Sequence, residues 1–124
     1  MSNWYARPLL FVRDIGRSVD FYVNQLGFTK SWGYEEEGTE FVAQVEREGC
    51  DLILSTQWPD KVGTAIIFIS LDLDVLHALR TELEGRHAPV TDGHWGYRLM
   101  VVRDPDGNEL YFNYPHESEA PPAG

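Results

Sequence analysis

The fold is decided by the stretch FVRDIGRSVDFY at residues 11–22, in which a strand gives way to a helix. The apolar residues that begin at Pro8 predict the strand, and a proline at its start cannot donate to a ladder and therefore suits a sheet edge. Asp14 is a typical helix N-cap, and apolar side chains then recur at helical spacing as far as Gly27. Because glycine permits the left-handed backbone that ends many helices, we expect a helix of about three turns.

Three strand-like segments follow this helix. Each is short and bounded by turn residues such as Gly38 and Gly49, and together they cover residues 29–34, 41–46 and 50–55. With the opening strand and helix, they predict a βαβββ unit over residues 7–55.

The same order of elements returns in the second half of the chain. After a linker at residues 56–63, a strand ends at Ser70 and a helix capped near Asp72 ends at Gly85. Strand-like segments then cover residues 90–92, 98–103 and 109–114. A shift of 57 positions aligns the halves, pairing for example Phe11 with Phe68, Tyr22 with Leu79, and Leu26 with Leu83. The pattern predicts a second βαβββ unit over residues 64–114.

Composition narrows the class of protein. The chain has 124 residues, 43% of them hydrophobic, which suits one domain over residues 1–115 with a flexible polar tail at 116–124. A single cysteine, Cys50, excludes an internal disulfide framework, and the N-terminus lacks a secretory signal, so we expect a cytoplasmic protein. No apolar run approaches the ~20 residues that cross a bilayer. A net charge of −10 repels phosphate backbones, so nucleic acid is not an expected partner.

Two motifs resemble a known family. The stretch at residues 11–28 is similar to the opening signature of the glyoxalase, bleomycin-resistance and extradiol-dioxygenase (vicinal oxygen chelate) superfamily, and DPDGN at 104–108 is similar to its last hairpin. The resemblance spans about residues 6–114, and the two motifs together are more specific than either alone. It implies an α+β fold in which the two βαβββ units form curved mixed sheets around a cleft.

Catalytic members of this superfamily bind a divalent metal through inward-facing His, Gln or Glu side chains. Carried over to this chain, the resemblance places the ligand positions at or beside Arg7, Ile53 or Leu54, Ala65, and Tyr111. None of these is a competent ligand, and a slip of one position does not supply one. Glu109 leaves one carboxylate on the face of Tyr111. We therefore expect no metal and no other cofactor.

Among metal-free relatives, the sequence is most similar to bleomycin-resistance proteins, which sequester a cationic drug without transforming it. The resemblance implies a homodimer with a groove between its subunits, in which aromatic side chains stack on flat rings of the ligand. The acidic charge of the chain suits a cationic, bleomycin-like molecule. We therefore expect a small-molecule-binding protein without catalytic residues, whose ligand is contacted by Trp32, Phe41, Trp95, Glu109 and Tyr111.

The individual residues also have plainer explanations. Aromatic side chains on strands are often core residues, so packing explains Phe41 and Phe68 as well as ligand binding does. Trp95 is a stronger candidate because it lies in the glycine-flanked loop DGHWG at residues 92–96.

Two other functions stay open. One is a metal-dependent lyase, isomerase or dioxygenase whose displaced site uses Glu109, His94 and a group from a partner chain, or a metal-free variant with Tyr111 and Glu109 as acid and base. The other is a dimeric interaction module whose cleft is filled by its own side chains.

Overall fold

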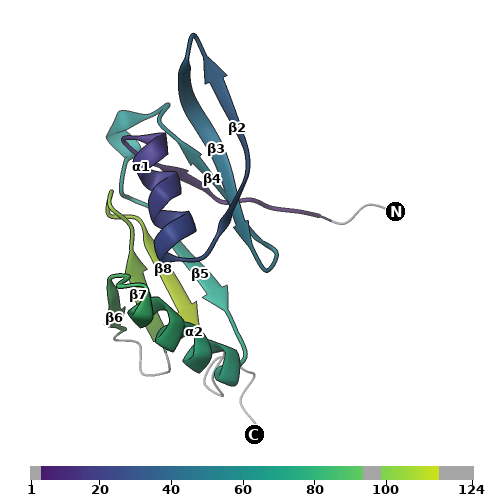
Figure 1. Ribbon diagram of the computed structural model, residues 1–124, viewed down its shortest axis with the longest axis vertical. Helices are drawn as coiled ribbons and strands as arrows, with labels where there is room; N and C mark the ends of the chain where they lie inside the picture. Colours follow the sequence, from purple (N-terminus) through teal and green to yellow (C-terminus); the bar gives the residue numbers. More distant parts are fainter. Residues whose placement is uncertain (1–3, 94–98, 115–124) are drawn as a thin grey trace, which may run out of the picture.

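In the computed structural model, which describes residues 4–93 and 99–114, the strands form two four-stranded sheets (Figure 1). The first half comprises β1 (Leu9–Phe11), α1 (Ile15–Asp20), η1 (Phe21–Gln25), β2 (Thr29–Glu36), β3 (Thr39–Arg47) and β4 (Cys50–Ser55). After η2 (Pro59–Lys61), the second half comprises β5 (Ile66–Ser70), α2 (Leu73–Gly85), β6 (Val90–Asp92), β7 (Leu99–Arg103) and β8 (Glu109–Asn113).

The two sheets share one topology. Their strand orders are β1-β4-β3-β2 and β5-β8-β7-β6, with the first and last strand of each half paired in parallel. The predicted α+β fold of two βαβββ units is confirmed.

The first helix contains a π-helical turn that the second helix lacks. The Asp14 carboxylate caps α1 by accepting a hydrogen bond from the Arg17 amide at 3.0 Å, and the chain then continues as η1, a π-helical turn. Such a turn inserts one residue. The extra residue is visible in the repeat. The N-caps Asp14 and Asp72 are 58 positions apart in the sequence, whereas Leu26 and Leu83, the buried residues near the helix ends, are 57 apart.

Tight turns close two hairpins of the first sheet. Glu37 and Gly38 have φ of 54° and 82°, and Glu48 and Gly49 have φ of 50° and 84°, so both central residues of each turn are left-handed. This geometry matches the twist of the flanking strands. The strand predicted at residues 29–34 was too short, because two residues suffice for the turn and Glu35 stays in β2.

The hydrophobic core lies on one face of each sheet and is shared by both halves. Helix α1 packs on β3 and β4, and one cluster of buried side chains runs from Leu10 and Leu54 in the first half to Val102 and Leu110 in the second. Residues of opposite parity on the strands are left on the other face of each sheet.

The halves are also joined by hydrogen bonds from the hairpin after β7. Asn108 Nδ2 donates to the Phe11 carbonyl at 3.1 Å, and the Tyr22 hydroxyl donates to Asp104 Oδ2 at 3.0 Å. These bonds are buried or partly buried, so they hold one half against the other.

No helix in the described part of the chain is long and apolar enough to cross a membrane. The domain limits and the tail predicted at residues 116–124 stay predictions, since the tail lies outside the described residues.

Candidate functional site

The face of the first sheet that points away from the core carries aromatic side chains. Strand pairing places one row across β1, β4, β3 and β2 at Leu9, Ile53, Gln44 and Trp32. The next row consists of Phe11, Ser55, Val42 and Tyr34. Trp32 is 40% exposed and Tyr34 is 53% exposed, so both rings are available on this face.

A β-bulge brings Phe41 to the same face. The pairing of β2 with β3 shifts between Tyr34 and Glu35, which leaves Phe41 as the extra residue of β3. A bulge breaks the alternation of side chains. The Phe41 ring consequently meets the Tyr34 ring edge-on, with centroids 5.3 Å apart, although simple alternation would separate them.

Arg7 lies on this face as well. Its Nη1 donates to Gln44 Oε1 at 2.8 Å, in the row that contains Trp32. Arg7 occupies one of the expected metal-ligand positions. Its guanidinium is hydrogen-bonded there to the side-chain amide of Gln44.

The corresponding face of the second sheet is partly apolar. Ile66 is 59% exposed and Phe68 is 41% exposed. Phe68 pairs with Tyr111 on β8, and their rings are 5.4 Å apart. Phe68 is therefore not a buried core residue. It lies beside Tyr111, which is one of the predicted site residues.

A charged cluster occupies the neighbouring row of this face. Arg103 Nη2 binds Glu109 Oε2 at 2.7 Å, and the Tyr111 hydroxyl donates to Glu109 Oε1 at 3.3 Å. Partial desolvation and the adjacent Glu109 carboxylate raise the pKa of Tyr111, so its hydroxyl stays protonated at neutral pH. The cluster therefore presents one carboxylate whose two oxygens are both already engaged.

The structure divides the predicted site residues between the two sheets. Trp32 and Phe41 share the exposed face of the first sheet, whereas Glu109 and Tyr111 share that of the second. Trp95 lies outside the described residues. Alternation along β8 was enough to pair Glu109 with Tyr111.

Sequence reasoning left Arg103 out of the predicted site. Its position opposite Glu109 follows from the hairpin at residues 104–108, because the predicted strands on either side end at Arg103 and begin at Glu109. The contact between Arg7 and Gln44 was not foreseen, because it joins residues 37 positions apart.

Within residues 4–93 and 99–114, no three or more His, Cys, Asp or Glu side chains form a group that could hold a metal ion. His94, the histidine considered for a displaced site, lies outside this part. The expectation of a metal-free protein therefore stays a prediction.

Comparison with known proteins adds an independent line of evidence. The family model described as Glyoxalase/Bleomycin resistance protein/Dioxygenase superfamily matches residues 3–112. No curated protein matches the sequence.

Several solved structures are similar. A bleomycin-binding protein from bleomycin-producing Streptomyces verticillus, complexed with copper(II)-bleomycin, is 25% identical with a TM-score of 0.70, covering 94% of this chain and 99% of that one. A glyoxalase/bleomycin resistance protein from Streptomyces sp. CB03234 is 26% identical with a TM-score of 0.66, covering 87% and 99%. A glyoxalase/bleomycin resistance protein/dioxygenase from Alicyclobacillus acidocaldarius has a TM-score of 0.74 at 20% identity, covering 96% and 97%, and shares the fold.

Proposed function

The chain belongs to the glyoxalase/bleomycin resistance protein/dioxygenase superfamily, and on that premise we propose that it is a metal-independent binding protein for a small molecule. The observation that carries the proposal is the pair of exposed faces, one on each sheet. Trp32 and Tyr34 on the first face, and Ile66 and Phe68 on the second, are large hydrophobic side chains left open to solvent. Exposed apolar surface of this kind marks sites of ligand or protein contact.

A homodimer would use both faces at once. In this proposal the face of the first sheet of one subunit and that of the second sheet of its partner enclose a cleft, so a dimer has two clefts. Each cleft then has an aromatic wall with Trp32, Tyr34 and Phe41, and an opposite wall with Phe68 and the Glu109 cluster. The similar Streptomyces verticillus protein is complexed with copper(II)-bleomycin, which supports a small-molecule ligand for this chain.

The chemistry of the two walls suits a cationic ligand with flat rings. Aromatic side chains stack on such rings, each good contact contributing about 0.5–1.5 kcal/mol beyond buried area. The net charge of −10 attracts a cation from solution. We therefore propose a bleomycin-like molecule as the ligand.

We also propose that the protein acts in the cytoplasm. A reducing compartment suits a chain whose single cysteine, Cys50, is free.

The direct test is a titration with bleomycin, metal-free and as its copper(II) complex, followed by tryptophan fluorescence and calorimetry. We expect saturable binding by the wild-type protein. Trp32→Ala should weaken it about tenfold, because losing one ring contact of ~1.4 kcal/mol changes affinity by that factor. His77→Ala, an exposed substitution on α2, should leave the affinity unchanged. Absence of saturation up to about 100 μM ligand would exclude bleomycin.

The dimer is tested separately by light scattering during gel filtration. We expect twice the 14.2 kDa mass of one chain. A monomer at about 100 μM protein would contradict the shared cleft, because the cleft needs a face from each of two subunits.

A further inference from the structure

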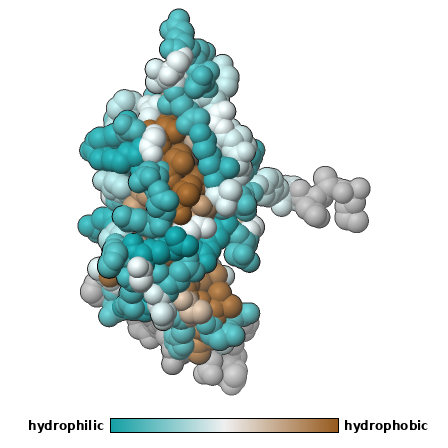
Figure 2. Space-filling view, in the orientation of Figure 1, coloured by the Kyte–Doolittle hydropathy of each residue, from teal (hydrophilic) through white to brown (hydrophobic). Residues whose placement is uncertain are grey.

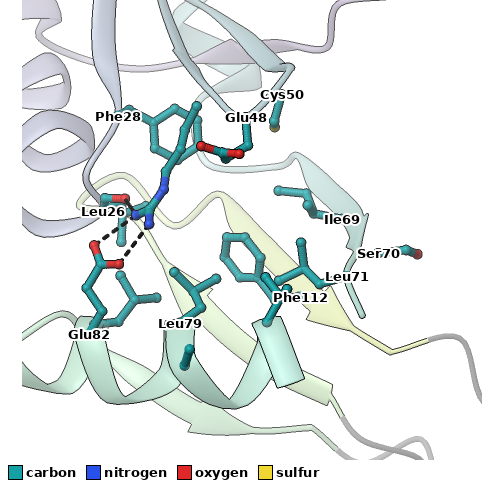
Figure 3. A pocket seen from close by; sticks show the side chains of 14 residues that line it. Leu26, Phe28, Glu48, Cys50, Ile69, Ser70, Leu71, Leu79, Glu82 and Phe112 are labelled. Carbon is teal, nitrogen blue, oxygen red and sulfur yellow. Dashed lines mark hydrogen bonds and ion pairs between the residues drawn. The ribbon is translucent and has the colours of Figure 1, made fainter. Parts of the chain in front are cut away.

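A pocket of about 250 Å³ lies between the two halves (Figure 3). The first half contributes Leu26, Phe28 and the hairpin between β3 and β4, and the second half contributes β5, α2 and Phe112 of β8. The site residues predicted above do not line it. The pocket is therefore separate from the proposed cleft.

The wall of this pocket is mainly apolar. In Figure 3 the side chains of Phe28, Leu79 and Phe112 lie around the hollow, with Ile69 and Leu71 on the side of β5. Figure 2 shows hydrophobic side chains gathered over the end of β5 beside α2 on the same side of the molecule. Val75, which lines the hollow, is 49% exposed, so the hollow opens to solvent and is not sealed within the core.

The two helices carry side chains of different size at the positions that the repeat aligns. A shift of 57 positions pairs Phe21 and Tyr22 of the first helix with Ala78 and Leu79 of the second. Phe21 and Tyr22 are buried in the core, where their two rings fill the space beside the helix. Ala78 and Leu79 are smaller and line the pocket, so α2 places no aromatic ring beside this hollow.

The charged groups at the rim of the pocket bind each other. Arg47 donates to both oxygens of Glu82 at 2.9 and 2.7 Å and to the Leu26 carbonyl at 2.7 Å. Arg86 Nε donates to Glu82 at 2.8 Å. The hydrogen bond to Glu82 raises the pKa of Arg47, and that same bond, with help from Arg86, lowers the pKa of Glu82. A charged ligand would have to displace one of these partners.

The single thiol in the wall is also uncharged at neutral pH. Burial raises the pKa of Cys50, which keeps the thiol protonated. The walls are uncharged, and the charged groups at the rim already bind each other. The pocket therefore favours a neutral occupant.

We propose that this pocket is a second binding site, which takes a neutral, largely apolar molecule of about two fused rings. The size follows from the volume, because an apolar cavity of about 150 Å³ accommodates benzene, and this pocket is larger. The proposal does not rest on the function proposed above, since none of the residues proposed for the cleft lines the pocket.

The first experiment uses N-phenyl-1-naphthylamine, a neutral dye that fluoresces in apolar surroundings. We expect saturable binding to the wild-type protein and at least tenfold weaker binding to Ala78→Phe, which restores the ring that the first half has at this position. Thr81→Phe is the matched control, because it adds the same side chain to an exposed position of α2 outside the pocket. Its affinity should stay within twofold of the wild type.

The second experiment uses Cys50 as a reporter and needs no variant in the pocket. Cys50 is the only cysteine of the chain, so alkylation by iodoacetamide at pH 8 reports on this wall alone. Saturating dye should slow the alkylation at least threefold, and Cys50→Ser provides the blank. If Ala78→Phe does not fold, the protection of Cys50 from alkylation still tests whether the dye occupies the pocket.

Independence from the cleft is tested with bleomycin and Trp32→Ala. We expect bleomycin not to displace the dye, and Trp32→Ala to bind the dye like the wild type. The proposal is overturned if bleomycin displaces the dye, if Ala78→Phe and Thr81→Phe weaken it equally, or if the dye leaves Cys50 unprotected. A change of oligomeric state in Ala78→Phe would also overturn it, because a second copy of the chain would then be the occupant.

Discussion

Two hairpin turns occupy corresponding places in the two halves and contact the helix of the opposite half. Arg47, at the end of β3, binds Glu82 of α2. Asp104, which the shift of 57 aligns with Arg47, accepts a hydrogen bond from Tyr22 of η1. The topology of the repeat thus produces two cross-contacts, one from each turn.

The two contacts differ in their access to water. Asp104 is 4% exposed, whereas the side chains of Arg47 and Glu82 are 29% and 33% exposed. Water weakens an ion pair at the surface but leaves a buried carboxylate dependent on its protein partners. The contact of Asp104 with Tyr22 therefore holds the two halves together, whereas the pair of Arg47 and Glu82 forms the rim of an open pocket.

The largest expected effect is that of Asp104→Ala. The Asp104 carboxylate accepts hydrogen bonds from the Tyr22 hydroxyl, the Asp106 and Asn108 amides, and Asn108 Nδ2, at 2.9–3.0 Å. Its removal leaves buried donors without a partner, so we expect the free energy of unfolding to fall by about 3–4 kcal/mol. Urea unfolding followed by circular dichroism measures the loss.

The control for this prediction is Glu48→Ala in the other turn. Glu48 is exposed, so its replacement should change the free energy of unfolding by less than about 0.5 kcal/mol. If the free energy of unfolding fell equally in the two variants, the Asp104 carboxylate would not be the group that holds the halves together.

A smaller effect is expected for Tyr22→Phe. The variant keeps the ring but loses the hydrogen bond to Asp104, which should cost about 1–1.5 kcal/mol at pH 8. Burial, and then the charge of Asp104, raise the pKa of Tyr22 well above its usual value near 10. The neutral hydroxyl therefore stabilises the folded state below pH ~10, and this contribution is lost as the pH rises above that value.

Urea midpoints between pH 8 and 11 test this alkaline dependence. The wild-type protein should lose stability above pH ~10 more steeply than Tyr22→Phe, which cannot ionise at that position. Parallel curves would mean that Tyr22 does not contribute to the alkaline transition.

The smallest effect is expected for Glu82→Gln, at the rim of the pocket. The hydrogen bond from Arg47 is the main cause of the lowered pKa of Glu82, so the ionised form stabilises the folded state at neutral pH. This contribution is present above the unfolded value of about 4.5 and is lost as the pH falls through the lower folded value. Because both side chains are about one-third exposed, solvent screening limits the loss at pH 7 to below about 1 kcal/mol.

Thermal unfolding at pH 7 and pH 3.5 measures the contribution of Glu82. The difference in stability between wild type and Glu82→Gln should shrink at the lower pH, which lies below the unfolded pKa of about 4.5. Glu84→Gln, in an exposed pair with Arg80, is the control and should change stability less at pH 7. If the difference in stability between wild type and Glu82→Gln grew at pH 3.5, the ionised form of Glu82 would not be the one that stabilises the folded state.

Part of the candidate site followed from sequence alone. The period of two along a strand placed Trp32 with Tyr34, and Glu109 with Tyr111, on common faces. The same rule failed for Phe41, because a bulge in β3 breaks the period.

Local patterns determined the order of elements, the repeat and the family, because caps, turn residues and hydrophobic periodicity depend on neighbours in the sequence. Tertiary structure alone decided what lies between the halves. Arg47 and Glu82 are 35 residues apart and Tyr22 and Asp104 are 82 apart, and only the packing of each turn on the opposite helix brings them together. The pocket beside Leu79 has the same origin, since an unfilled volume is a property of several packed elements and not of any one segment.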